Sequence, residues 1–210
     1  MVQVKRVAVI GMGLSGCTVA RLLAERGYQV ECYEDGDEVG GLCSDEFSDH
    51  GYYQKFGPHI LHTDDTDVYN FLSRFGDLSN RMEHRVGIIP EHTMPIVVPY
   101  PISEETYDKL GVLGIDVESA MVTPRNFEEA CCKKFGRPMY EKVIKVNTER
   151  SWYPLKPADL PVEVASRVFM SNDRLLFNDN QYVGVPYDGW SRLLRSMVDH
   201  PAIDIRYKLS

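Results

Sequence analysis

The chain has 210 residues, of which 43% are hydrophobic and 26% are charged, and its formal net charge is −8 at pH 7. This composition predicts a globular protein of one large domain or two small ones and excludes a disordered chain. The acidic balance disfavours a general nucleic-acid surface, and no apolar run is long enough to cross a bilayer.

The five cysteines favour a reducing environment. They are an odd set without C-x-x-C spacing, so neither a disulfide framework nor a zinc site is predicted. The first residues lead directly into an apolar strand, and no signal peptide is predicted. We therefore expect a cytoplasmic protein that binds no metal and no membrane.

The strongest local motif lies where an apolar strand beginning at Val7 runs into Gly11, Gly13 and Gly16. In this G-x-G-x-x-G spacing the glycines allow a tight turn, close approach of the backbone to a pyrophosphate, and close packing of helix on strand. The phosphates then bind the free N–H groups at the helix N-terminus. Glycine-rich turns also occur as plain strand-to-helix connections, so the flanking elements decide between the two interpretations.

The flanking elements favour a dinucleotide site. The helix after the glycines is predicted to end near Gly27, and residues 29–34 predict a second strand that ends in Glu34. A carboxylate roughly 20 residues after the glycines bonds the ribose hydroxyls in dinucleotide-binding folds. The unit predicts a Rossmann-type domain in an α/β protein.

A polar loop follows and ends in the pair Gly40-Gly41, where the backbone can run close to a bulky group. Taken alone, this loop is equally compatible with a flexible connection. A strand-end acid followed by Gly-Gly is characteristic of FAD-binding chains rather than of simple NAD dehydrogenases. The cofactor expected at the glycine turn is therefore FAD.

The sequence predicts that residues 65–168 form an inserted region that is mainly helical. Apolar residues spaced along one face predict a helix from Asp65 to Gly76. Two short strands, at residues 86–89 and 95–98, are expected to pair as a small antiparallel sheet. Helices are also predicted at residues 104–110, at 126–135 with a cap at residues 123–126, at 138–146, and after Pro161 up to Arg167.

The last part of the chain is expected to rejoin the first. A helix after Gly189-Trp190 is followed by residues 203–207, which alternate as a strand does and are expected to return to the dinucleotide-binding sheet. The predicted domains are residues 1–64 with 169–210, which bind FAD, and residues 65–168, which form the substrate region.

Five ordered motifs resemble those of UDP-galactopyranose mutases and together span nearly the whole chain. They are the glycine turn, the acid with Gly-Gly, KFGPHILHT at residues 55–63, TERSW at residues 148–152, and YVGVP at residues 182–186. By this resemblance the chain is a short form that lacks the C-terminal part of the family.

The resemblance implies an enzyme that interconverts the pyranose and furanose forms of a UDP-sugar. In the family mechanism reduced FAD attacks the anomeric carbon through its N5 atom and forms a flavin–sugar adduct, without net redox change. The cofactor carries the covalent chemistry, and the protein holds the sugar in line with N5 and binds the diphosphate with cations.

The resemblance also implies the residues of the site. His59 and Arg167 are expected in catalysis, although a satisfied core histidine and a solvated surface arginine are the commoner roles of such residues. His62 is expected to be structural. Cofactor contacts are expected from Gly11, Gly13, Ser15, Gly16, Glu34, Gly40, Gly41, Leu42, Gly57, His59 and Ile60. Substrate contacts are expected from His84, Thr148, Trp152, Arg167 and Phe177.

Three hypotheses stay open. A mutase-type enzyme would act as a homo-oligomer or with a second chain that supplies the missing half. An FAD-dependent oxidoreductase of the amine-oxidase type shares the FAD-binding start, but nothing after Gly41 favours it. A non-catalytic remnant that binds flavin or nucleotide sugar is suggested by the length and by Asn147 and Leu176, which stand where the family has tyrosine.

Overall fold

The computed structural model describes residues 5–49, 51–79, 83–89, 94–112, 123–173 and 180–208. The chain divides into two compact units, residues 1–80 with 180–210 and residues 81–179. The sequence predicts boundaries after residues 64 and 168, whereas the structure has them after residues 80 and 179. The helix after Asp65 packs into the first unit through the buried Leu72 and Phe75. At the other end, Met170 forms a parallel bridge with Ile102 and so stays with the second unit.

The first unit is built on a three-stranded parallel sheet in the order β1-β2-β9. Strand β1 (Arg6–Ile10) pairs with β2 (Gln29–Tyr33), and β2 pairs with β9 (Ile203–Arg206), with Val30 opposite both Val7 and Ile203. The predicted return of the last strand to the dinucleotide-binding sheet is therefore confirmed.

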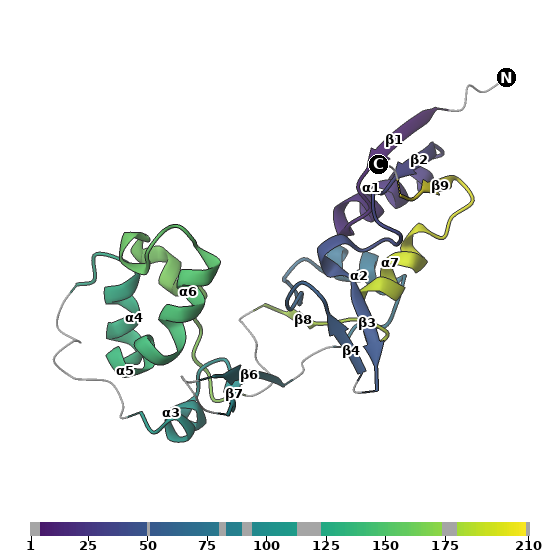
Figure 1. Ribbon diagram of the computed structural model, residues 1–210. Coiled ribbons are helices and arrows are strands. Elements are labelled where there is room, and N and C mark those ends of the chain that lie inside the picture. The colour runs from purple at the N-terminus through teal and green to yellow at the C-terminus, as the bar shows by residue number, and fades with distance from the viewer. Residues whose placement is uncertain are drawn as a thin grey trace. The chain divides into compact units, whose positions relative to one another are not determined.

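Helix α1 (Leu14–Glu25) packs on this sheet, and α7 (Trp190–Val198) packs on α1 (Figure 1). Cys17 and Ala20 of α1 are fully buried, because the spacing of apolar residues gives the helix one face toward the core. Met12, in the turn before α1, is also fully buried. The same core takes in Leu72, Phe75 and Leu78 from α2 (Thr66–Ser73) and the turn after it.

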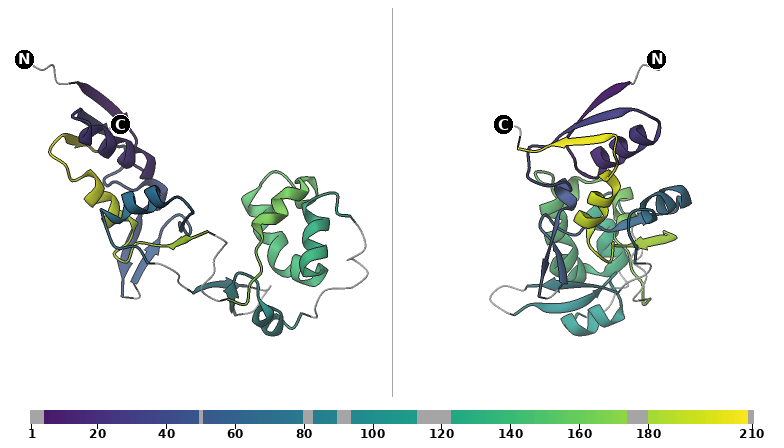
Figure 2. Two further views of the ribbon diagram at one scale, coloured as in Figure 1. Left: turned by 180° about the vertical axis from the view of Figure 1, so that it is seen from behind. Right: turned by 90° about the vertical axis from the view of Figure 1, so that its right-hand side faces the viewer.

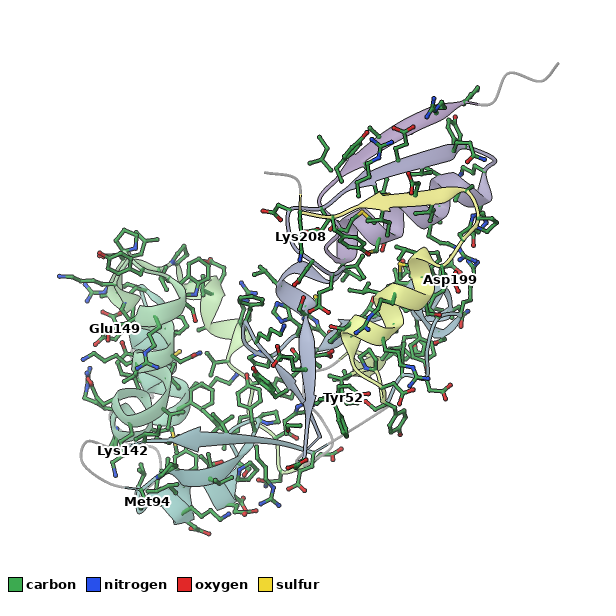
Figure 3. The ribbon with its side chains drawn as sticks, turned by 45° about the vertical axis from the view of Figure 1, so that its right-hand side comes forward. Tyr52, Met94, Lys142, Glu149, Asp199 and Lys208 are labelled. Carbon is green, nitrogen blue, oxygen red and sulfur yellow. The ribbon has the colours of Figure 1, made fainter. Side chains whose placement is uncertain are left out.

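Two antiparallel pairs complete the first unit. Strand β3 (Asp45–Ser48) pairs with β4 (Gly51–Gln54), and β5 (Leu61–Thr63) pairs with β8 (Tyr182–Gly184). In Figure 3 the label of Tyr52 marks β4, and that of Asp199 marks the C-terminal end of α7. These short strands were not predicted, because none has enough alternating apolar residues to stand out from the loops around it.

The second unit is mainly helical, as expected, and it includes the small antiparallel sheet of β6 (His84–Ile88) and β7 (Ile96–Tyr100). Its helices, seen from two further sides in Figure 2, pack together. Their core of buried residues includes Phe127, Phe135 and Tyr140. The α-helices are α3 (Glu104–Leu110), α4 (Phe127–Phe135), α5 (Arg137–Met139) and α6 (Lys145–Ser151), and 3-10 turns cover Pro157–Asp159 and Val162–Arg167.

The helix predicted at residues 138–146 is not one continuous α-helix. It begins as α5, passes through a π-helical turn at Tyr140–Ile144, and continues as α6. The predicted N-cap of α4 is confirmed, because the side chain of Asn126 accepts a hydrogen bond from Glu129 N.

All five cysteines are buried free thiols, and burial raises the pKa of Cys17 to about 12. Among the described residues no three His, Cys, Asp or Glu side chains gather as metal ligands would. No helix in the described ranges has the length and hydrophobicity that a membrane span needs.

Candidate cofactor and substrate site

The turn after β1 has the geometry that its glycines predict. Gly11 has a positive φ of 83°, and a Cβ on Gly16 would lie 1.9 Å from Gly11 O, so only glycine fits at the start of α1. The first backbone bond of α1 runs from Cys17 N to Gly13 O at 3.0 Å. The amides of residues 14–16 precede this bond and have no acceptor within the helix. They can donate to a phosphate.

The Gly40-Gly41 loop lies directly against this turn. Gly40 N donates to Met12 O at 2.8 Å, and Gly40 and Gly13 form a parallel bridge. A Cβ on Gly41 would lie 3.1 Å from Gly13 Cα, and both loop glycines have positive φ. Two segments far apart in the sequence thus form one glycine-lined backbone surface.

Glu34 is fixed beside this surface. Its Oε2 accepts from Met12 N at 2.6 Å, its Oε1 accepts from Gly36 N at 2.9 Å, and the residue is 9% exposed. A carboxylate has about four acceptor positions, so two remain for the hydroxyls of a ribose. The turn, the loop and the carboxylate together fit the ribose and pyrophosphate of a dinucleotide.

The segment that carries His59 follows β4 and is tied to the glycine loop. Lys55 N donates to Ser44 O at 3.2 Å, and Lys55 Nζ forms ion pairs with Glu46 at 2.8 Å and Glu38 at 3.3 Å. His59 is half-buried, and its Nδ1 lies 2.9 Å from Gly57 O.

The first unit holds every residue for which a cofactor contact is expected, including the half-buried Ile60 and the 67% exposed Leu42.

The expected substrate residues that the structure describes belong to the second unit. Thr148 is 6% exposed, and its hydroxyl donates to Ile144 O at 2.8 Å. Trp152 is half-buried at the end of α6, and Arg167 is exposed at the end of its 3-10 turn. Leu176 and Phe177 lie outside the described residues. That these residues join His59 in one site stays a prediction.

His84, at the start of β6, is half-buried, and burial lowers its pKa below the usual 6.5. The unfolded state then binds more protons than the folded state as the pH falls through this range, so the protein loses stability on acidification. We expect the melting temperature to fall less steeply between about pH 7 and pH 5 in His84→Gln than in the wild type. Parallel pH profiles of the two proteins would contradict this.

Comparison with known proteins gives the relatives of this fold. Residues 9–75 match the family model described as an NAD(P)-binding Rossmann-like domain. The dTDP-fucopyranose mutase of Escherichia coli is 28% identical over 95% of this chain and 55% of its own length. A probable UDP-galactopyranose mutase of Klebsiella pneumoniae is 28% identical over 96% of this chain and 55% of its own.

The chain is similar to nucleotide-sugar mutases over nearly all of its length. The resemblance predicted from the five motifs is confirmed. A crystal structure of reduced UDP-galactopyranose mutase aligns with a TM-score of 0.63 at 18% identity over 97% of this chain and 49% of that one, which supports the Rossmann-type fold. The chain spans about half the length of the curated relatives that it matches.

Three residues beside the site were missed by reasoning from the sequence. Asp45, Gln54 and Trp190 make hydrogen bonds that connect β3, the His59 segment and α7. One signal was available. Helix α7 begins after Gly189, which has no side chain to cap the helix, and this indicates a cap from elsewhere in the fold.

Proposed function

We propose that this chain binds FAD in its first unit and acts on a pyrimidine nucleoside-diphosphate sugar, interconverting its pyranose and furanose forms. The observation that carries the proposal is the joined surface of the Gly11–Gly16 turn and the Gly40-Gly41 loop beside Glu34. Similarity to mutases over 95% of the chain supports the reaction class. The reaction is proposed for a whole mutase, of which this chain spans about half the length.

Each residue has a defined task in this proposal. The free amides at the start of α1 bind the pyrophosphate of FAD, and Glu34 accepts from its ribose hydroxyls. Gly57 and His59 would contact the flavin ring. When reduced, FAD supplies the nucleophile for exchange at the anomeric carbon, with no net redox change.

The second unit would hold the nucleotide sugar. Trp152 stacks on the pyrimidine ring, as aromatic side chains do with bases. The guanidinium of Arg167 pairs with diphosphate oxygens, so it neutralises the charge on the leaving nucleotide when the sugar–oxygen bond breaks. Exposure of Arg167 leaves its guanidinium accessible to such a ligand.

The reaction can be tested directly. The purified chain is incubated anaerobically with reduced FAD and UDP-galactose or dTDP-fucose, alone and with a polypeptide that supplies the remaining length. A furanose product from either sugar is expected in the supplemented reaction. Flavin binding with persistent inactivity in both reactions would favour a binding subunit. Substrate-dependent bleaching of flavin with oxygen consumption would favour an oxidoreductase instead.

The role of Trp152 gives a quantitative prediction. Trp152→Ala should weaken binding of the nucleotide sugar by roughly 1–3 kcal/mol, because stacking on the base is lost. Tyr153→Ala is a matched control, since Tyr153 is the next residue and is 86% exposed. Titration of both variants with UDP-galactose would measure the difference. An unchanged dissociation constant in Trp152→Ala would remove this residue from the site.

A further inference from the structure

The backbone N–H and C=O of His59, which belong to two adjacent peptide groups, are both hydrogen-bonded to side chains. His59 N donates to Gln54 Oε1, and His59 O accepts from Gln54 Nε2 at 3.2 Å and from Trp190 Nε1 at 2.7 Å. Gln54 is the last residue of β4, and Trp190 is the first residue of α7. A strand and a helix distant in sequence therefore hold the same residue.

Trp190 is itself fixed by its surroundings. The residue is 3% exposed, and its indole has a single N–H donor that must find an acceptor when buried. The acceptor that this fold provides is the carbonyl of His59. The indole is packed in the core, and rotating it would break the bond to His59 O. The bond therefore has one defined geometry.

Asp45 holds the start of α7 in place. Its carboxylate accepts from the amides of Trp190 and Ser191, and its own amide donates to Ser191 Oγ at 3.0 Å. A Cβ on Gly189 would lie 2.7 Å from Asp45 Oδ2, so the helix begins in direct contact with β3. The negative charge is also favourable at the positive end of the helix dipole.

We infer that Trp190, anchored by Asp45, is a positioning residue that fixes the backbone of His59 for its contact with the flavin. This inference rests on the proposed function for the flavin contact only. The hydrogen bonds that hold His59 are a property of the protein without ligand. They can be tested separately from flavin binding.

The first test uses Trp190→Phe, which keeps an aromatic ring and removes the N–H donor. The exchanging His59 N–H is bonded to Gln54 Oε1, and Trp190 holds the same residue through its carbonyl. Loss of the Trp190 bond should let this segment open more often, so exchange of the His59 amide, followed by NMR in the ligand-free protein, should become roughly 5- to 10-fold faster. Tyr69→Phe is the control, because it removes one polar atom from another aromatic residue of the same unit, although Tyr69 is half-buried and Trp190 is buried. Unchanged exchange at His59 in Trp190→Phe would overturn the inference.

Gln54→Met removes the two bonds from the other side chain that holds the His59 backbone, and Gln54 is half-buried, so this variant stays informative if Trp190→Phe fails to fold. Because both side chains donate to the His59 carbonyl, the effects of the single and double variants on the exchange rate should be non-additive. Additive effects would mean that the two residues act independently, and this would overturn the inference.

The second test concerns the flavin. Trp190→Phe should weaken FAD binding about 5-fold or more and alter the visible absorption of the bound flavin relative to Tyr69→Phe. An unaltered affinity and spectrum, in a variant whose His59 exchange has increased, would contradict the positioning role. If the wild-type chain itself binds no FAD, the proposed function fails, and the hydrogen-exchange result alone decides whether Trp190 holds His59.

Discussion

Gly13→Val should fold with a melting temperature close to that of the wild type and lose FAD binding by about 100-fold or more, which corresponds to ~2.8 kcal/mol. Gly13 has φ −70° and ψ −174°, an extended conformation that valine adopts readily. Its Cβ would meet Gly40 O and Gly41 Cα at 3.9 Å, an ordinary contact. The branched methyl groups would then occupy the place proposed for the pyrophosphate.

The neighbouring glycines provide the contrast that this test needs. Gly16→Ala should prevent folding of the first unit or destabilise it strongly, because its Cβ would lie 1.9 Å from the backbone oxygen of Gly11. Gly87→Val is the control for adding a branched side chain, since a Cβ there meets nothing within 4 Å. Thermal melts and FAD titration of the three variants separate folding from binding. Full FAD affinity in Gly13→Val would be incompatible with the proposed phosphate site.

Asp45→Ala should lower the free energy of unfolding by about 1–3 kcal/mol. Asp45 is 6% exposed, and its carboxylate caps α7. Removal of the carboxylate leaves the buried amides of Trp190 and Ser191 without their acceptor. Chemical denaturation followed by circular dichroism measures the change.

The next residue on β3 provides a matched comparison for Asp45. Glu46 has the same charge, but its side chain is 53% exposed and its ion pair with Lys55 is at the surface. Glu46→Ala should therefore change the free energy of unfolding by about 0.5 kcal/mol or less. Equal destabilisation by the two substitutions would show that Asp45 does not cap α7.

The elements that could be predicted from the sequence are those with local signals. The apolar run before Gly11 predicts a strand, the glycine spacing predicts a turn and a helix, and Glu34 marks the end of a second strand. All of these signals lie close together in the sequence. The return of residues 203–207 to the sheet was also predicted, because their alternating pattern suits a strand that needs a partner. Residues 203–206 form that strand and pair with β2. These features position the residues for which cofactor contacts are expected.

The contacts that hold the site together could not be predicted in the same way. Asp45 caps a helix 145 residues later in the chain, and Trp190 bonds to a carbonyl 131 residues earlier. The sequence around each of these residues carries no pattern that predicts its distant partner. The pairs are therefore visible only in the folded structure. The π-helical turn at Tyr140–Ile144 likewise depends on packing, because residues 138–146 carry no sequence signal against a regular α-helix.

Binding of FAD to the purified 210-residue chain tests the central proposal most directly. Equilibrium titration followed by flavin absorbance should give saturable binding of one FAD per chain. This binding should be retained in Gly87→Val and lost in Gly13→Val. Absence of saturable binding to a folded chain, or equal binding by wild type and Gly13→Val, would contradict the account of a flavin site on the joined glycine surface.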